Sequence, residues 1–363
     1  MKSLKLNKTT RWNYLTYLLV ILAYVILQVL GSAGAISSSL KGMLVPICAY
    51  IVMAISLNLT VGVLGELSLG HAGFMSMGAF TGVTAAIALQ DTVPSAPLRM
   101  AIALAVGAAF AALAGFLIGI PVLRLNGDYL AIVTLAFGEI IRNVINCLYV
   151  ALDGSALRIS FNNPVVQDAA RTAEGIPFQV LINGPQGATV STKLATFTMG
   201  FALIIFSLIV VLNLINSRSG RAIMAIRDNR IAAESVGIGV TKFKMMAFVI
   251  LAALAGMAGA LYSLNYSTVT ASKFKFDTSI LVLVFVVLGG IGNIRGSIIA
   301  ATLLTVLPEL LRAFNDYRML IYAIVLILVM LTTNNPRFKQ LREGLMEKLR
   351  RGKGAGNESE GGV

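Results

Sequence analysis

Long apolar segments recur along almost the whole chain, and they limit the possible folds more than any other feature. Several run for about 20 residues, the length that an α-helix needs to cross a bilayer core of about 30 Å. This pattern predicts an all-α polytopic membrane protein with about ten transmembrane segments, some of them short or broken by glycine. The segments are residues 14–30, 43–62, 66–88, 100–122, 129–150, 194–214, 245–264, 279–292, 297–312 and 318–332.

The composition supports this class and excludes others. Hydrophobic residues make up 57% of the 363 residues and charged residues only 12%, whereas a soluble domain carries about 25% charged residues. A transmembrane β-barrel would instead show short segments of alternating polarity. The net charge of +13 does not indicate nucleic-acid binding, because the basic residues lie in short connections between spans, where they determine topology.

The positions of the basic residues predict the orientation in the membrane. The N-terminus (1–13), the connection 216–244 and the basic tail (336–363) are expected in the cytoplasm, and the tail is partly disordered by composition. They flank and interrupt a transmembrane domain over 14–335, whose first span is retained as a signal-anchor. The largest external loop, 151–193, is rich in proline and glycine, and we expect it to form a small cap or docking surface.

Small residues recur every three to five positions between Asn58 and Ala79. Such spacing lets helix backbones approach closely, and broken helices direct free backbone groups into a transport pathway. The only histidine of the chain lies in this break, and it is either a gating residue or a structural partner of a neighbouring helix. Glu66 is either an interfacial carboxylate or part of a proton relay. The candidates for pathway or gating roles are Gly62, Gly65, Ser68, Gly70 and His71.

Glu139 and Arg142 are charged residues inside an apolar segment. Their spacing places them on one face of a helix, close enough to form an ion pair. Ionisable residues within a membrane usually face the interior of the helix bundle. We expect a structural or interhelical ion pair, with a substrate contact or a proton-transfer step as the alternative.

A glycine-dense turn separates the apolar segments 279–292 and 297–312. It lacks the Gly-Lys-Ser/Thr ending and the strand–helix context of a nucleotide-binding loop. A re-entrant turn or a tight helical hairpin is expected, with close helix packing as the simplest interpretation. Its glycines are Gly289, Gly290, Gly292 and Gly296.

The sequence contains no recognisable catalytic or metal site. A single histidine excludes a histidine-based metal cluster, and Cys48 and Cys147 lie in apolar segments without a Cys-x-x-Cys pair. We therefore expect no metal, no cofactor and no enzymatic activity. An integral membrane enzyme is disfavoured for the same reason.

The connection 216–244 is polar and basic, yet it contains an amphipathic pattern that predicts a helix over 221–238. Glycines after this pattern supply a helix stop. The helix could insert into a groove of a partner protein or lie on the membrane surface, and a solvated loop is the third possibility. The residues expected to serve docking are Arg221, Arg227, Ala232, Ala233, Glu234 and Gly237.

Four motifs occur in an order that resembles the branched-chain amino acid ABC transporter permeases, the LivM-type members more than their LivH-type partners. They are residues 58–79, 129–142, 219–238 and 289–296. The third is similar to a degenerate form of the EAA-type loop that contacts the ATPase of such importers, although it lacks the strict Glu-Ala-Ala order. The resemblance covers most of residues 40–335 and departs from the family pattern in the external loop, so it predicts the fold more firmly than the substrate.

The resemblance implies a permease subunit of an ATP-driven importer in the bacterial cytoplasmic membrane. Such a subunit translocates leucine, isoleucine or valine by alternating access, and the helix over 221–238 would act as a lever. The implied partners are a second homologous permease, two cytoplasmic ATPase subunits, an external solute-binding protein and the lipid bilayer, without nucleic acid. Two alternatives stay open. One is an ABC permease for urea, a short amide or another amino acid, and the other is an ion-coupled secondary transporter, which needs mid-membrane carboxylates or histidines.

Overall fold

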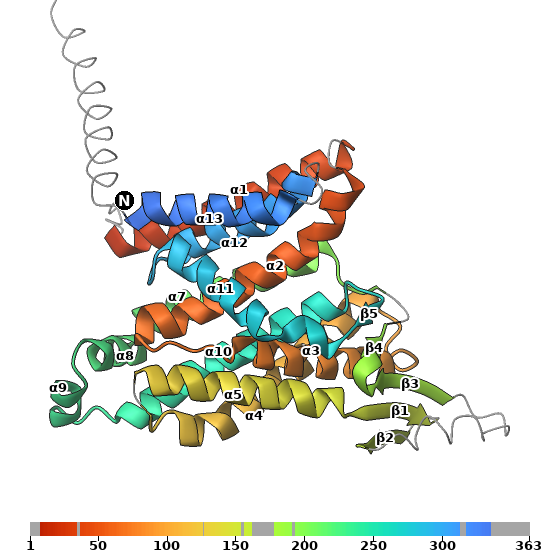
Figure 1. Cartoon of the computed structure of the whole chain (residues 1–363), viewed down its shortest axis with the longest axis horizontal. Coiled ribbons are helices and arrows are strands. Elements are labelled where there is room, and N and C mark those ends of the chain that lie inside the picture. Colours follow the sequence, from red (N-terminus) through yellow and green to blue (C-terminus); the bar gives the residue numbers. More distant parts are fainter. Residues whose placement is uncertain are drawn as a thin grey trace, which may run out of the picture. The chain divides into compact units, whose positions relative to one another are not determined.

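Helices dominate the computed structural model of the chain (Figure 1). The structure describes residues 8–34, 37–125, 127–153, 156–161, 178–190, 193–312 and 317–334. The expected cytoplasmic tail, most of the N-terminus and the centre of the expected external loop lie outside these residues. The chain divides into two compact units, Met1–Val306 and Leu307–Val363, and the elements discussed below belong to the first unit unless stated.

Each predicted apolar segment corresponds to a helix in the structure. Polar side chains begin several of them; for example, the Thr196 hydroxyl accepts a hydrogen bond from the N–H of Met199 at the start of α7. The helices are α1 (Lys8–Ser32), α2 (Ser38–Asn58), α3 (His71–Ala88), α4 (Ala96–Val122), α5 (Asp128–Asn146), α7 (Phe197–Asn216), α10 (Val240–Ser263), α11 (Phe276–Gly289), α12 (Ile294–Leu310) and, in the second unit, α13 (Arg318–Asn334).

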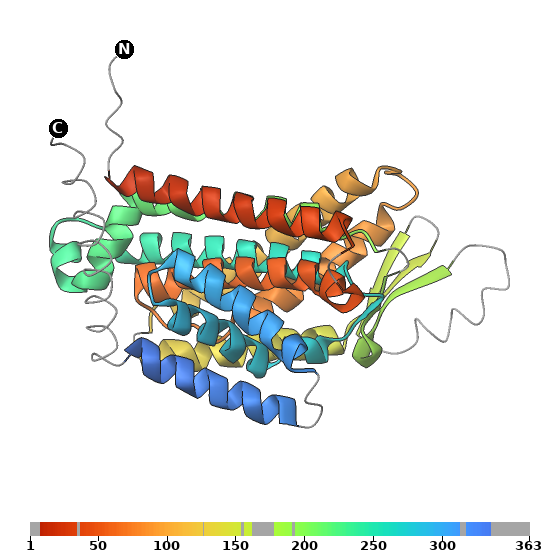
Figure 2. The same ribbon diagram turned by 90° about the horizontal axis from the view of Figure 1, so that it is seen from above.

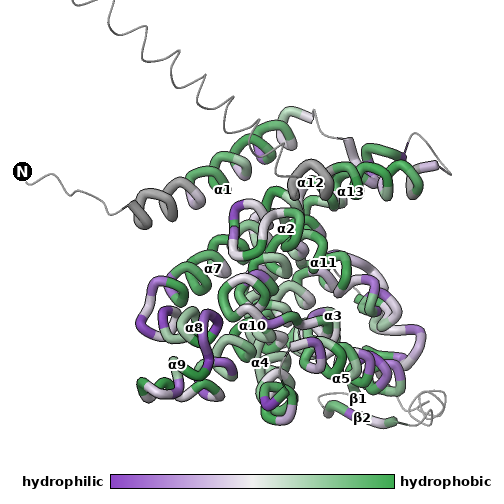
Figure 3. The backbone as a smooth tube through the Cα atoms, turned by 60° about the vertical axis from the view of Figure 1, so that its left-hand side comes forward, coloured by the Kyte–Doolittle hydropathy of each residue, from purple (hydrophilic) through white to green (hydrophobic). Residues whose placement is uncertain are grey.

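Four helical segments in the described part of the chain are long and apolar enough to cross a membrane by length and composition: Ser38–Leu64, Ala96–Val122, Phe197–Asn216 and Val240–Ser263. Shorter apolar helices accompany them, at Thr16–Ser32 and Phe276–Gly289. The chain is therefore a polytopic helical membrane protein, while ten separate crossings stay a prediction. The colouring in Figure 3 shows apolar residues along these helices and polar residues gathered around α8 (Arg218–Asp228) and α9 (Arg230–Ser235).

The centre of the first unit is the contact of α3, α4 and α10. Gly78, Gly107 and Gly256 meet there, so that a Cβ atom built on Gly107 would lie 2.9 Å from the carbonyl oxygen of Gly78. A Cβ atom on Gly259 would likewise overlap the carbonyl group of Met75. Glycine is required at this contact because only a residue without a side chain permits such close backbone approach.

A small antiparallel sheet is an exception to the predicted all-α fold. Its strand order is β2-β1-β3-β4-β5. The prediction was wrong here because the segment that follows α5 forms strands, and because the helix that was expected to reach residue 150 ends at Asn146. The strands are β1 (Tyr149–Asp153), β2 (Ala156–Ser160), β3 (Phe178–Asn183), β4 (Ala188–Thr189) and β5 (Thr268–Val269).

The sheet and the pair α8–α9 lie at opposite ends of the helices of the first unit. Figures 1 and 2, which are turned by 90° from one another, agree on this placement. In a membrane protein, elements at opposite helix ends lie on opposite sides of the bilayer. The sheet includes the ends of the segment predicted as the external loop, and α8–α9 form the connection predicted as cytoplasmic.

The single helix predicted over 221–238 is wrong, because the connection forms two helices that break at Asn229. Asn229 has an extended backbone (φ −156°, ψ 105°), and its Oδ1 accepts a hydrogen bond of 3.0 Å from the N–H of Ala232. Asparagine is among the best residues for this capping bond, so it starts a new helix. Gly237, with φ +84°, follows α9 and stops it as predicted.

Candidate functional site

The helical break predicted within residues 58–79 exists, and it has an unusual form. α2 continues as a π-helix, η1 (Leu59–Leu64), in which the carbonyl oxygen of Thr60 accepts hydrogen bonds from the N–H groups of Gly65 and Glu66. Gly65 then takes a positive φ of +78°, and the chain stays non-helical until α3 begins at His71. The expected start at residue 66 is wrong, because Gly65 turns the chain out of the helix. π-Helical turns are frequent at functional sites.

The structure brings this break against the glycine turn between α11 and α12. Asn58 Nδ2 donates to Ser297 Oγ (2.6 Å), and the N–H of Gly292 donates to Asn58 Oδ1 (3.0 Å). A Cβ atom on Gly62 would overlap the backbone of Gly292. Two motifs separated by more than 200 residues therefore form one contact.

The glycine turn joins α11 to α12 over a few residues, and the two helices with this turn are called the hairpin below, while its predicted re-entrant form stays a prediction. A Cβ atom on Gly289 would overlap the backbone of Gly296. Gly290 and Gly292 have φ angles of +93° and +80°, which L-residues with side chains rarely adopt. All four glycines of the motif therefore have a steric reason to be glycine.

His71 is fully buried at the start of α3. Its Nε2 lies 2.8 Å from Ser56 Oγ and 3.2 Å from the carbonyl oxygen of Met53, both on α2. Its Nδ1 has no hydrogen-bond partner in the described part of the chain. The N–H of Ala72 donates to Ser279 Oγ on α11 (3.0 Å). The beginning of α3 is thus bonded to two other helices.

The same end of α3 packs closely on α5. The N–H of Leu69 donates to Thr134 Oγ1 (3.1 Å), and Cβ atoms on Gly70 and Gly73 would collide with the backbones of Thr134 and Gly138. Gly70 is therefore needed for helix contact. Ser68 is buried as well, and its hydroxyl has no partner among the described residues.

Glu139 and Arg142 are within contact distance on α5. Arg142 Nε donates to Glu139 Oε2 at 2.7 Å, and Glu139 Oε1 accepts from the N–H of Phe276 at 3.2 Å. The side chains are 17% (Arg142) and 33% (Glu139) exposed. The pair therefore links α5 to the beginning of α11.

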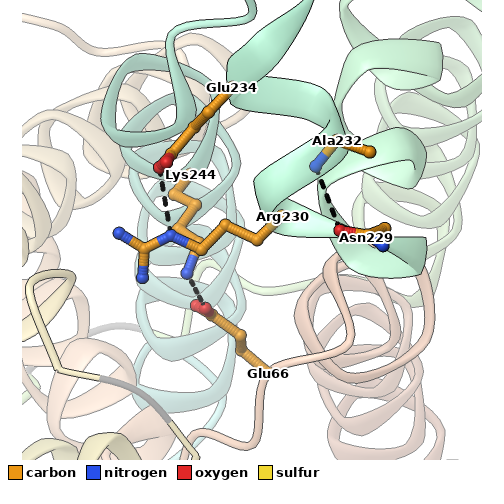
Figure 4. A network of polar contacts seen from close by, with 6 residues as sticks. All are labelled: Glu66, Asn229, Arg230, Ala232, Glu234 and Lys244. Atoms are coloured by element: carbon orange, nitrogen blue, oxygen red, sulfur yellow. Dashed lines mark hydrogen bonds and ion pairs between the residues drawn. The ribbon is translucent and has the colours of Figure 1, made fainter.

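The connection 216–244 contacts the break at two points. Arg227 Nη1, from α8, donates to the carbonyl oxygen of Gly62 at 2.9 Å. Lys244 Nζ, from α10, forms an ion pair with Glu66 Oε1, and both side chains are largely buried (Figure 4). These contacts place the pathway candidates and the connection in one site.

Comparison with known proteins identifies the family of the chain. The sequence profile of a family described as "Branched-chain amino acid transport system / permease component" matches residues 39–330. The chain belongs to this permease family. Its function is that of a permease subunit, and no solved structure matches it.

Curated relatives of the permease come from bacteria and an archaeon. The "High-affinity branched-chain amino acid transport system permease protein LivM" of Escherichia coli K12 is 36% identical over 315 residues, which cover 85% of this chain and 72% of the relative. The "Probable branched-chain amino acid transport permease protein LivM" of Methanocaldococcus jannaschii is 25% identical over 275 residues, 68% of this chain and 74% of the relative. LivH of Salmonella typhimurium is 33% identical over 117 residues, 32% of this chain and 38% of the relative.

The α8–α9 region of the permease differs from the predicted docking surface. Ala233 is only 3% exposed, because it lies in an apolar cluster with Ile226 and Val240. The prediction that Ala233 faces a partner is wrong for this reason. Ile231 and Val236 are 79% and 74% exposed instead.

The other residues predicted for docking lie near this surface. Arg230 Nε donates to Glu234 Oε1 at 3.1 Å along α9 (Figure 4), and Ala232 is exposed. Arg221 Nη1 donates to the carbonyl oxygen of Asn216 (3.2 Å). These contacts lie within the connection 216–244.

Three contributors to the site were missed in the sequence. Lys244 was counted only as a topological charge, although a lysine within the first turns of an apolar helix needs a partner. Thr134 and Ser297 carry no signal of their own, because small hydroxyl residues are common in membrane helices. Their roles depend on contacts between distant segments.

Proposed function

We propose that the permease translocates branched-chain amino acids as the membrane subunit of an ATP-driven importer. The observation that carries the proposal is the 36% identity to LivM of Escherichia coli across most of both chains, together with the name of that relative. Leucine, isoleucine and valine are the proposed substrates, and alternating access is the proposed mechanism. Hydrolysis of ATP takes place on partner subunits, so this subunit is not an enzyme.

The proposed topology uses ten membrane crossings, formed by the ten helices that correspond to the apolar segments. Both termini and α8–α9 lie in the cytoplasm of a bacterial cell, and the sheet lies outside. The basic residues of the connection 216–244 support this orientation, because positively charged connections stay on the cytoplasmic side. The opposite placement of the sheet supports it as well (Figure 2).

The proposed pathway passes the helical break. Buried polar side-chain atoms without a partner are rare in proteins, and each calls for an explanation. In the described part of the chain five of the seven such atoms lie between residues 60 and 76, and an amino acid or water passing through would supply the missing partners. The beginning of α3 adds a partial positive charge that suits a carboxylate. The atoms are Thr60 Oγ1, Glu66 Oε2, Ser68 Oγ, His71 Nδ1 and Ser76 Oγ.

The proposed partners are a second homologous permease, two cytoplasmic ATPase subunits and an external solute-binding protein. The partial similarity to LivH supports pairing with a related permease. The exposed apolar side chains Ile231 and Val236 support contact of α9 with an ATPase subunit. In helix-in-groove interfaces, the apolar face of one helix packs into a groove of the partner protein.

The direct test is uptake of labelled leucine by proteoliposomes that contain the permease with the candidate partner subunits encoded beside it. We expect uptake only with ATP and binding protein, and no uptake when the ATPase lacks its P-loop lysine. Uptake driven by a proton gradient through the permease alone would instead support a secondary transporter. ATP-driven uptake of urea or an amide without leucine would move the substrate assignment to the related solutes.

The pathway has a test of its own in cysteine labelling. In a background with Cys48→Ala and Cys147→Ser, a Ser68→Cys variant of the complete complex is expected to react with a water-soluble maleimide in either the nucleotide-free or the ATP-bound state, and leucine is expected to slow the reaction. The matched control is Ser207→Cys, because Ser207 is buried on α7 and its hydroxyl bonds, among the described residues, to the carbonyl oxygen of Leu203 on its own helix. Protection of position 68 in every state would exclude the pathway at this break.

A further inference from the structure

In both contacts between the connection 216–244 and the helical break, a basic side chain of the connection bonds to the turn that leaves the π-helix. Arg227 reaches the carbonyl oxygen of Gly62 within the π-helix (2.9 Å), and Lys244 reaches Glu66 directly after it. Both ends of the turn that leaves the π-helix are therefore held by side chains from one cytoplasmic connection. Gly65 lies between the two anchored positions.

Arg227 is placed for this contact by its neighbours. The last carbonyl groups of a helix have no partner within the helix, so the carbonyl of Gly62 can accept the hydrogen bond. Asp228 Oδ1 accepts from Arg227 Nε (3.1 Å) and Nη2 (3.0 Å) and orients the guanidinium. A Cβ atom on Gly65 would lie 2.5 Å from Arg227 Cγ. The absence of a side chain at Gly65 therefore makes room for the stem of Arg227.

The ion pair of Lys244 with Glu66 is shielded from water. The side chains are 5% and 14% exposed, respectively, and Glu66 Oε2 has no partner in the described part of the chain. A largely buried charge that loses its partner is strongly unfavourable. The cytoplasmic end of α10 and the break therefore have to move together.

The contacts continue from the break to the hairpin of α11 and α12. Gly62 lies against the backbone of Gly292, and Asn58 bonds to both Gly292 and Ser297. π-Helical turns are frequent at functional sites, and this turn contacts both α8 and the hairpin. A displacement of α8 can thus reach two separate helices through this turn.

We propose that Arg227 and the Glu66–Lys244 pair are positioning residues that pass the movement of α8–α9 to the helical break and its glycine hairpin. The inference rests on the proposed function, because it assumes that an ATPase moves α8–α9. It names the residues by which that movement reaches the pathway. In a permease that lacks these residues, ATP hydrolysis continues, but the helical break no longer moves with α8–α9.

The test is Arg227→Met in the complete reconstituted complex, with leucine uptake and ATP hydrolysis measured on the same proteoliposomes. Methionine keeps an apolar stem over Gly65 and removes the hydrogen bond to Gly62. We expect uptake to fall about tenfold, the size expected for one charge-assisted hydrogen bond, while hydrolysis stays within about twofold of the wild type. The matched control is Arg218→Met, because Arg218 is exposed on the same helix, and it is expected to change neither rate.

Equal uptake by Arg227→Met and Arg218→Met would overturn the proposal. Loss of the assembled complex in Arg227→Met would overturn it too, because Arg227 would then serve assembly alone. Arg227→Lys keeps one donor and is expected to regain part of the uptake. A wild-type complex without ATP-driven leucine uptake would instead count against the proposed function, so the two failures are distinguishable.

The ion pair is tested by exchange of its charges. Glu66→Lys and Lys244→Glu are each expected to lower uptake per ATP hydrolysed, because each places two like charges together in a buried site. The double variant is expected to recover at least about tenfold over either single variant. A double variant whose uptake per ATP equals that of the single variants would show that the pair does not couple, and would overturn its part in the proposal.

Discussion

Gly78→Leu is expected to leave almost no folded permease in the membrane. A Cβ atom at this position would overlap the backbone of Gly256 on α10, and Gly107 of α4 approaches the same point. Overpacking of a core that can relax costs about 1 to 3 kcal/mol. Here the obstacle is backbone rather than side chain, so α3, α4 and α10 would have to separate. We expect a loss above about 3 kcal/mol, a large part of the stability of a typical domain.

The measurement is the yield of monodisperse protein after detergent extraction and its thermal unfolding midpoint. Gly42→Leu is the matched control, because Gly42 lies in α2 with no atom within 4 Å of a Cβ atom built on it. The control is expected to extract and unfold like the wild type. A Gly78→Leu protein with an unchanged yield and midpoint would show that the close contact of α3 and α10 is not required.

The helices could be predicted because membrane spans need length and apolar composition, and both are visible in a sequence. The expected segments 100–122 and 245–264 end within one residue of α4 and α10, and they begin four and five residues later than these helices. The helix boundaries at the break between α2 and α3 could not be predicted with the same accuracy. The start of α3 at His71 depends on the positive φ of Gly65, and no periodic pattern reveals a backbone angle.

Part of the sheet escaped prediction because β4 and β5 are short and pair over a long sequence distance. Thr268 and Val269 form a strand of two residues that pairs with Ala188 and Thr189, too few residues for a period-two pattern. The same limit applies to the site. Gly62 and Gly292 belong to motifs that the sequence singles out, but their contact depends on the packing of α2 against the hairpin.

The orientation of α9 shows how one capping residue changes a surface. A continuous helix over 221–238 would follow a single stripe of apolar residues. The break at Asn229 starts a new helix, which turns Ala233 into the apolar cluster and leaves Ile231 and Val236 outside. The connection was predicted to dock a partner, and the side chains available for docking are different ones.

The double variant Ile231→Asp with Val236→Asp is expected to abolish ATP-driven uptake while the permease still inserts and folds. Both residues are more than 70% exposed, so their replacement removes little internal packing of this chain. Burial of an Ile or Val side chain stabilises a complex by about 1.5 to 3 kcal/mol. Two such losses weaken the affinity for the ATPase by roughly a hundredfold or more.

Co-purification of the ATPase with the tagged permease measures this affinity, and leucine uptake measures its consequence. Thr241→Asp is the control, because Thr241 is exposed in the first turn of α10, where a helix N-terminus tolerates a negative charge. It adds charge to the same connection without removing an apolar side chain, and both readouts are expected to stay unchanged. Normal co-purification by the double variant would place the ATPase contact elsewhere on the permease. Co-purification lost equally in the control would mean that charge near α9, rather than its apolar side chains, governs the contact.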